Sequence, residues 1–129
     1  MKNFLEKVNF EEKKVIAIDF DGVIHKNSKG FYNGKVYDDP VDGSLTAIKD
    51  LSKNYDIIIF TCKALKDRPL IEGKTGKELI IEWLKKQNIN QYIKDVSYEK
   101  PRAFLYIDDK GYRFSNWQKT LDYIRELNK

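Results

Sequence analysis

Three short apolar runs restrict the possible folds of this 129-residue chain more than any other feature. Residues 15–18 (VIAI), 57–60 (IIIF) and 103–107 (AFLYI) contain no charged side chain and are rich in β-branched and aromatic residues. Such uninterrupted runs are typical of strands that are covered on both faces in a parallel sheet. A weaker run at 96–98 (VSY) predicts a fourth strand.

Helical patterns separate these runs. Leu45, Ile48 and Leu51 fall on one face of a helix, and capping boxes at 75–78 (TGKE) and 115–118 (SNWQ) precede further apolar positions at helical spacing. Strands that alternate with helices of this length imply right-handed crossovers. We therefore expect a single α/β domain over residues 1–129, with a three-layer, Rossmann-like open parallel sheet and helices on both of its faces.

Residues 31–37 (FYNGKVY) depart from this alternation. Asn33 and Gly34 lie between two runs of aromatic and β-branched residues, which is a strong signal for a β-hairpin. We expect a small hairpin flap whose aromatic side chains either stack on a nucleobase or pack against the sheet edge. These aromatic residues are Phe31, Tyr32 and Tyr37.

Composition limits the cellular setting. The longest apolar run has five residues, whereas a membrane-spanning helix needs about 20, so we expect neither a membrane span nor a signal peptide. Cys62 is the only cysteine, which excludes an intramolecular disulfide and favours a reducing cytoplasm. The net charge of +4 comes from dispersed lysines and suits a solvated surface, which could also attract phosphorylated partners. Residues 1–14 fit either a short edge helix or a loosely held terminus.

Polar residues follow each of the three strongest runs. Asp19 and Asp21 come after the first run, Thr61 after the second, and Asp108 and Asp109 after the third. Because parallel strands point the same way, these side chains converge at the sheet edge where α/β proteins bind ligands. Clustered carboxylates without His or Cys suit Mg²⁺ with a substrate phosphate. Turn capping by single Asp residues is the simpler alternative, and two acidic pairs at one edge weigh against it.

These residues resemble the motifs of the haloacid dehalogenase superfamily, in the same order along the chain. Residues 15–23 (VIAIDFDGV) are similar to its first motif, a strand followed by DxDG, and the strand that ends at Thr61 resembles the second. Lys100 resembles the lysine of the third motif, and residues 106–109 (YIDD) resemble the acidic fourth motif. The resemblance is to small, capless, phosphatase-like members of phages and bacteria, and it extends from Val15 to Trp117.

The resemblance implies phosphoryl transfer through an aspartyl-phosphate intermediate. Asp19 would be the nucleophile, and Asp21 would protonate the leaving oxygen and later deprotonate the hydrolytic water. Thr61 and Lys100 would bind the phosphate, and Lys100 would also offset negative charge as a catalytic residue. Gly22 would shape the phosphate-binding turn.

A bound Mg²⁺ ion is also implied by the resemblance. The side chains of Asp19 and Asp108 and the backbone carbonyl of Asp21 would be its ligands. Asp109 would act farther from the metal or would orient the catalytic lysine.

Several neighbouring residues allow more than one interpretation. Lys94 or Lys110 could replace Lys100, which we prefer because its loop directly precedes the last strand. His25 could contact substrate or shuttle a proton, although a hydrogen-bonded loop histidine is the simpler interpretation. Three cations that follow Thr61 could hold a second anionic group, although a solvated loop explains them more simply. They are Lys63, Lys66 and Arg68.

Three functions are consistent with these features. The first is a Mg²⁺-dependent phosphatase that hydrolyses a phosphomonoester. The second is a receiver-like phospho-acceptor module, which would carry its acidic pair first, whereas this chain carries that pair last. The third is a catalytically silent nucleic-acid-binding domain, which the positive charge and the flap aromatics suggest. We favour the enzyme.

The spacing between the motifs bears on the substrate. Residues 22–44 leave room for the hairpin alone, and residues 61–100 for one helix and a short strand, so neither stretch fits the cap domain that many members of the superfamily insert. We expect an open edge that accepts a phosphorylated small molecule, a nucleotide or a polynucleotide end. Oligomerisation could instead cover that edge with a neighbouring subunit.

Overall fold

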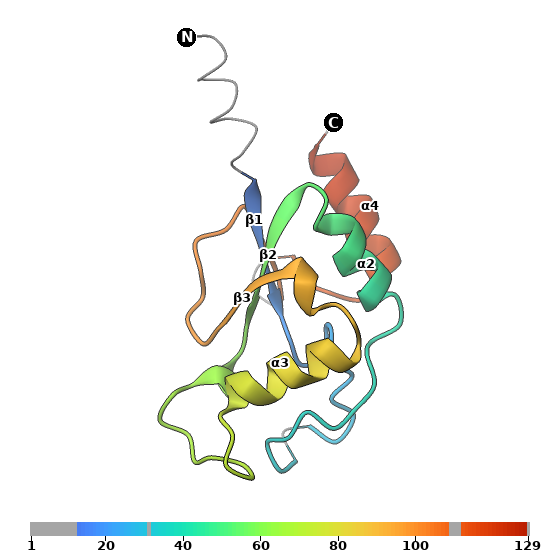
Figure 1. The fold of residues 1–129 in the computed structure, drawn as a ribbon. Coiled ribbons are helices and arrows are strands. Elements are labelled where there is room, and N and C mark those ends of the chain that lie inside the picture. The colour runs from blue at the N-terminus through green and yellow to red at the C-terminus, as the bar shows by residue number, and fades with distance from the viewer. Residues whose placement is uncertain (1–12, 31, 109–111, 129) are drawn as a thin grey trace, which may run out of the picture.

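A four-stranded parallel sheet forms the centre of the computed structural model, which describes residues 13–30, 32–108 and 112–128 (Figure 1). The strand order is β3–β2–β1–β4. The strands are β1 (Lys14–Asp19), β2 (Tyr55–Phe60), β3 (Ile93–Ser97) and β4 (Leu105–Ile107). The α-helices of the described residues are α2 (Ser44–Leu51), α3 (Gly76–Lys86) and α4 (Trp117–Leu127), and the 3-10 turns are η1 (Cys62–Ala64) and η2 (Asn90–Tyr92). The prediction of an α/β fold with a parallel sheet is confirmed.

A strand forms at each of the four predicted places, and their apolar residues build the core. The weak run at 96–98 is only partly right, because β3 covers Ile93–Ser97 and ends before Tyr98. In the parallel register, Ile18 of β1 lies opposite Ile59 of β2 and Ile107 of β4, and all three side chains are fully buried. β1 is therefore a central strand between β2 and β4. β4 begins at Leu105, two residues later than the apolar run, and Phe104 is exposed beside it.

The three predicted helices also form, with one change at a cap. Thr75 and Glu78 make both hydrogen bonds of the predicted capping box, each 3.1 Å long, at the start of α3. At α4 the cap is Asn116, whose side chain accepts a hydrogen bond from the Lys119 N–H at 2.9 Å, and not the predicted Ser115. Asparagine caps a helix as well as serine does, so the neighbouring residue could take that role. Helices α2 and α4 lie side by side, and α3 lies apart from them near β3 (Figure 1).

Two tryptophans attach the long segment after β1 to the helices. The indole N–H of Trp83 in α3 donates to the carbonyl of Asp38 at 2.9 Å, and that of Trp117 in α4 donates to the carbonyl of Val23 at 3.1 Å. Both indole rings are buried, so each bond satisfies a polar group that would otherwise be costly to bury. This segment is therefore held at both of its ends.

The predicted hairpin flap does not form paired strands in its described residues. Residues 32–35 form a turn and a bend, and residues 36–37 are irregular; the Asn33 side chain accepts a hydrogen bond from the Lys35 N–H at 3.0 Å. Tyr37 donates its hydroxyl to the Gly30 carbonyl at 2.8 Å. These local side-chain bonds compete with a strand ladder, and the positive φ of 51° at Tyr32 is incompatible with an extended strand. Phe31 lies outside the described residues. We call residues 26–39 the flap loop.

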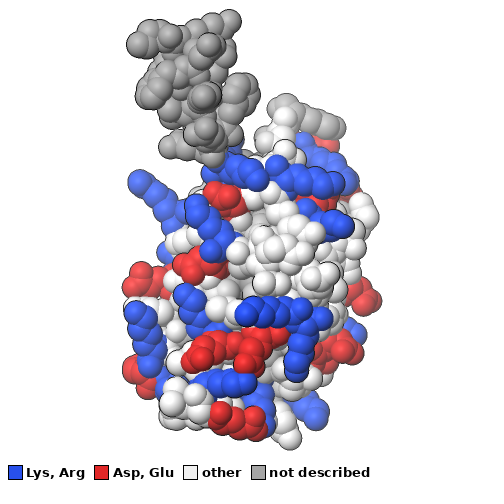
Figure 2. Space-filling view, in the orientation of Figure 1, with Lys and Arg blue, Asp and Glu red and all other residues white. Residues whose placement is uncertain are grey.

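Other expectations concern the surface and the parts outside the described residues. The alternatives for residues 1–14 fall almost wholly outside the described chain. Within the described part, no helix is long and apolar enough to cross a membrane. On the face seen in Figure 2, basic and acidic side chains are interspersed, as expected of a solvated surface.

Candidate active site

The carboxyl ends of β1, β2 and β4 carry predicted site residues. Asp19 ends β1, Thr61 directly follows β2, and Asp108 directly follows β4. Since Ile18 is in register with Ile107, the next residues, Asp19 and Asp108, reach the same level on adjacent strands. Thr61 belongs to the other neighbour of β1. The structure therefore brings all three residues to one edge of the sheet.

A tight turn after β1 returns Asp21 to this edge. Gly22 has a φ of +84°, a left-handed conformation that costs little for glycine and more for any other residue. Its N–H donates to the His25 carbonyl at 2.7 Å, and the His25 N–H donates to the Phe20 carbonyl at 3.0 Å. The Gly22 N–H thus already serves the turn, and a phosphate contact from this residue remains a prediction.

Lys63 and His25 both contact the same oxygen of the Asp21 carboxylate. Lys63 Nζ and His25 Nδ1 each lie 2.9 Å from Asp21 Oδ1. The Lys63 side chain is 3% exposed, and that of Asp21 is 24% exposed. Lysine is seldom buried without a partner, so the pair is an integral part of the fold at this edge.

The electrostatics of Asp21 follow from these neighbours. Burial raises the pKa of the carboxyl, but the hydrogen bonds from His25 and Lys63 and the positive charge of Lys63 outweigh it, so the pKa lies below its ordinary value of 3.8. Asp21 is therefore an ionised carboxylate at neutral pH. Because both donors use Oδ1, Oδ2 is the oxygen that neither of them engages.

The hydrogen bonds of His25 define its tautomer. Its Nε2 accepts a hydrogen bond from the backbone N–H of Asp38 at 2.9 Å. A backbone N–H can only donate, so Nε2 carries no proton and the proton of the neutral ring is on Nδ1, which donates to Asp21. The ring is fully buried and stacks on Phe20 with centroids 5.3 Å apart. His25 thus connects the flap loop to the candidate acid.

The flap loop closes on itself at Asp38. The Asp38 carboxylate accepts hydrogen bonds from the Ser28 hydroxyl at 2.5 Å and from the Ser28 N–H at 2.9 Å. These bonds lower the pKa of Asp38 to about 2. The loop therefore reaches His25 with the Asp38 backbone in a fixed position.

Lys63 is held at three points along its length. Its N–H donates to the Thr61 hydroxyl oxygen at 3.2 Å, which starts the 3-10 turn η1, and its Nζ binds Asp21. Its carbonyl packs against the first residue of α3, Gly76, where an added Cβ would lie 1.6 Å from the oxygen. Thr61 is buried, and a hydroxyl that accepts one bond keeps its own hydrogen as a donor.

Lys100 extends toward the end of β4. Its Nζ lies 3.2 Å from Asp108 Oδ2 and 4.4 Å from the centre of the Tyr106 ring. Lys94 instead pairs with Asp56 at 3.2 Å, near the amino end of β2 and away from this edge. Of the two described lysines considered for the third motif, Lys100 is therefore the one at the site.

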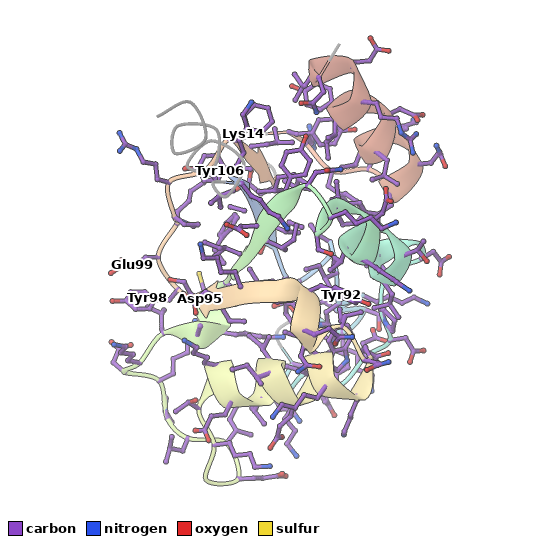
Figure 3. The ribbon with its side chains drawn as sticks, turned by 45° about the horizontal axis from the view of Figure 1, so that its top comes forward. Lys14, Tyr92, Asp95, Tyr98, Glu99 and Tyr106 are labelled. Atoms are coloured by element: carbon purple, nitrogen blue, oxygen red, sulfur yellow. The ribbon has the colours of Figure 1, made fainter. Side chains whose placement is uncertain are left out.

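The loop between β3 and β4 carries Lys100 back to the sheet. Figure 3 shows Tyr98 and Glu99 together at the end of β3, and Tyr106 on the strand to which this loop returns. The Tyr106 hydroxyl donates to the Pro101 carbonyl. This hydrogen bond attaches the loop to β4 at the residue that follows Lys100.

The described residues offer the kind of oxygen ligand that Mg²⁺ prefers. Asp19 and Asp108 place carboxylates at the same level of adjacent strands, and Mg²⁺ commonly takes one or two carboxylates together with waters and phosphate oxygens. Within the described ranges, no three His, Cys, Asp or Glu side chains are gathered closely enough to form a metal cluster. The Asp21 carboxylate is turned to Lys63, which is compatible with a metal contact through its backbone carbonyl. Asp109 and Lys110 lie outside the described residues.

Sequence reasoning missed the role of Lys63. Its interpretation as a solvated loop residue is wrong, because the side chain is buried against Asp21. The sequence feature that could have indicated this burial is Thr-x-Lys after a buried strand. A 3-10 turn capped by Thr61 bends the chain back toward the sheet edge and brings Lys63 with it. His25 is hydrogen-bonded, as the simpler interpretation held, and its partner at i−4 is Asp21.

Comparisons of the chain with protein-family models, curated proteins and solved structures found no match. Function is therefore inferred from the motif residues and from the contacts they make at the sheet edge.

Proposed function

We propose that this chain is a Mg²⁺-dependent phosphatase of the haloacid dehalogenase type, which hydrolyses a phosphomonoester through an aspartyl-phosphate. Two lysine–carboxylate pairs at the sheet edge where β1 ends in Asp19 carry the proposal. Lys63 binds Asp21, which lies far from it in the sequence. Lys100 binds Asp108, which lies on the other side of β4. Charged groups that a fold collects in this way at a ligand-binding edge are typical of an active site.

The first step transfers the phosphoryl group to the protein. A carboxylate oxygen of Asp19 attacks phosphorus, the bond from phosphorus to the leaving oxygen breaks, and Asp21 gives that oxygen a proton. Asp21 carries this proton on Oδ2, because Lys63 and His25 occupy Oδ1. The lowered pKa of Asp21 leaves it ionised at rest, and the negative charge of an arriving phosphate favours its protonation.

The second step releases phosphate from Asp19. Asp21, ionised again after the first step, takes a proton from a water whose oxygen attacks phosphorus, and the bond between phosphorus and the Asp19 oxygen breaks. Inorganic phosphate leaves and the Asp19 carboxylate is restored. Lys63 and His25 favour the ionised form of Asp21, which is the form that accepts the proton in this step.

The remaining residues counter the charge of the phosphate. The Thr61 hydroxyl donates to a phosphoryl oxygen, and Lys100 balances negative charge on the phosphate and the neighbouring carboxylates. When bound by Asp19 and Asp108, Mg²⁺ would neutralise further charge on the transferred group. Positioning and electrostatics thus supply most of the catalysis.

Four finer points belong to the same proposal. Helix α3 lies apart from α2 and α4, which supports a three-layer, Rossmann-like arrangement of the sheet and helices (Figure 1). A phosphorylated small molecule, a nucleotide or a polynucleotide end is the substrate class. The single cysteine supports a cytoplasmic setting. The motif order favours this enzyme over a receiver-like module.

Loss of the nucleophile tests the function directly. Asp19→Asn keeps the shape of the side chain but loses its nucleophilicity, so release of phosphate from p-nitrophenyl phosphate with Mg²⁺ falls to the background rate. Circular dichroism checks that the variant is folded, and Asp50→Asn on the exposed surface of α2 serves as the matched control with the wild-type rate. Hydrolysis by Asp19→Asn at the wild-type rate would refute the mechanism.

A further inference from the structure

A cavity of about 280 Å³ lies beside the buried Lys63. Its walls come from two parts of the chain that are far apart in the sequence, the flap loop and residues 63–76. They include Asn33 and Gly34 from the flap loop, Lys63 from η1, and Arg68, Pro69 and Ile71 from the stretch between η1 and α3. We call this cavity the Arg68 pocket.

The position of the Arg68 pocket relates it to the proposed acid. Lys63 both lines the pocket and binds Asp21 through its Nζ. A single side chain, that of Lys63, thus lies between the pocket and the carboxyl group that would protonate the leaving oxygen. A leaving group bonded to that oxygen has to lie on the Asp21 side of the phosphate, and Lys63 links that side to the pocket.

The lining of the pocket presents hydrogen-bond donors and positive charge. The Asn33 side-chain oxygen accepts from the Lys35 N–H, so its NH₂ group is the part that can face a ligand as a donor. Arg68 contributes a guanidinium, which has donors and no acceptor. The charged residues among the described lining residues are Lys63 and Arg68, and because the Lys63 ammonium is paired with Asp21, we assign the contact with a ligand anion to Arg68. Such a lining is complementary to a ligand that has acceptors and negative charge.

We infer that the Arg68 pocket binds the leaving group of the substrate and selects leaving groups that carry a second anionic group. This inference rests on the proposed phosphatase activity. Arg68 would bind the second anion, and the apolar atoms of Pro69 and Ile71 would contact the carbon frame of the leaving group. The volume is close to the lower end of the roughly 300–1,000 Å³ typical of ligand pockets, so the pocket accommodates one small unit of a substrate.

Matched pairs of phosphate esters test the selection in the wild-type protein. Adenosine 3′,5′-bisphosphate is compared with adenosine 5′-monophosphate for a phosphate anion, and 3-phosphoglycerate with glycerol 3-phosphate for a carboxylate anion. In at least one pair, kcat/KM is about 10- to 100-fold higher for the ester with the second anion, as expected of a charge-assisted contact. This preference exceeds the roughly twofold gain that two equivalent phosphates would give, and the pair that responds identifies the anion.

Variants assign the preference to Arg68. Arg68→Gln removes the charge and lowers the preference to about twofold or less, whereas Arg68→Lys retains part of it because it keeps a cation. Arg125→Gln removes an exposed arginine of α4 as the matched control and keeps the full preference. Circular dichroism checks that Arg68→Gln is folded, and its hydrolysis of the ester without the second anionic group is the reference from which its preference is calculated.

The outcomes separate the inference from the function on which it rests. Hydrolysis of all four esters without a preference overturns the anion-selecting pocket and leaves the phosphatase intact, and so does a preference that survives Arg68→Gln. Failure to hydrolyse p-nitrophenyl phosphate and all four esters overturns the phosphatase and, with it, the leaving-group assignment. A misfolded Arg68→Gln leaves the wild-type comparison and Arg68→Lys as tests.

Discussion

The ammonium of Lys63 lies 2.9 Å from Oδ1 of Asp21, and this lysine side chain is almost completely buried. The pair joins the turn after β1 to the turn after β2 and so connects two adjacent strands at the edge where the motif residues meet. It also provides a cation next to the carboxyl group that we propose as the acid and base. Stability and activity are therefore coupled at this pair.

Removal of Lys63 destabilises the protein in a pH-dependent manner. Lys63→Met lowers the free energy of unfolding at pH 7 by about 1–3 kcal/mol, because the partly buried Asp21 keeps its charge without this donor. In the wild type, burial raises the pKa of Asp21 but His25 and Lys63 lower it further, to below 3.8. The stabilisation from Asp21 is thus complete above about pH 4 and is lost as the pH falls through the folded-state pKa.

Urea unfolding at pH 7 and at pH 3 measures this effect. The deficit of Lys63→Met relative to wild type is largest at pH 7 and shrinks at pH 3. The double variant Lys63→Met/Asp21→Asn loses less stability than the two single variants added together, since the neutral amide needs no cation. Equal deficits at the two pH values would contradict an ionic role for Lys63.

His25 donates a hydrogen bond to Asp21 and accepts one from the Asp38 N–H, and different substitutions separate these two contacts. In His25→Asn the side-chain NH₂ can replace Nδ1 as a donor to Asp21, whereas in His25→Gln the longer side chain can replace Nε2 as the acceptor for the Asp38 N–H. We expect His25→Asn to keep more phosphatase activity, and His25→Gln to keep more hydrogen-exchange protection at the Asp38 amide. Both variants lose a buried ring, so their thermal stabilities fall by similar amounts. The reverse order of activities would argue against donation from His25 to Asp21.

Gly76 is expected to be intolerant of a side chain. The Cβ of Gly76→Ala would lie 1.6 Å from the Lys63 carbonyl oxygen, so the backbone of η1 or the start of α3 has to move. Overpacking of this kind costs about 1–3 kcal/mol, and the movement displaces Lys63 from Asp21. Thermal unfolding and phosphatase assays should both detect the change.

Gly30→Ala is the matched control for Gly76→Ala. Gly30 has a φ of +67°, and its added Cβ would meet no atom within 4 Å, so the cost is confined to backbone strain of about 1 kcal/mol. It should lower the melting temperature slightly and leave activity unchanged. If Gly76→Ala behaves in the same way, the close approach to Lys63 has no functional consequence.

Sequence patterns predict the elements of this fold better than they predict its loops. The buried runs that contain Ile18 and Ile59 can form few structures other than central strands, and Thr75 with Glu78 defines a helix start locally. The Asn33–Gly34 pair is a hairpin signal. In the structure, however, the side chains of Asn33 and Tyr37 hydrogen-bond to backbone groups of the flap loop, which take the place of hydrogen bonds between paired strands. Local propensity alone cannot decide between these two outcomes.

The candidate site shows the same division. Strand polarity predicts that Asp19 and Asp108 reach one edge, because it depends on sheet topology alone. The burial of Lys63 depends on the direction of a three-residue turn and on its contact with Gly76, which lies thirteen positions later in the sequence. Such a contact has no periodic pattern in the sequence. It becomes visible only in three dimensions.

Dependence on Mg²⁺ is the last prediction, and Asp108 is the residue that tests it. Hydrolysis should cease in excess chelator and return when Mg²⁺ is added, because the chelator removes the divalent cation that would offset the charge of Asp19, Asp108 and the phosphate. Asp108→Asn removes one charged ligand, so we expect the Mg²⁺ concentration for half-maximal activity to rise by about 10-fold or more. Lys100 also loses its ionic partner in this variant.

A second substitution separates the loss of the metal ligand at Asp108 from the loss of its ion pair with Lys100. Lys100→Met breaks the same ion pair but leaves both carboxylates in place, so it should lower kcat while the Mg²⁺ requirement stays near that of the wild type. Asp122→Asn, on the exposed surface of α4, controls for the loss of a negative charge in general. Undiminished hydrolysis in excess chelator would exclude a magnesium site at this edge. An equal shift in the Mg²⁺ requirement for Lys100→Met and Asp108→Asn would instead assign the dependence to the ion pair, since that pair is the feature the two variants both lose.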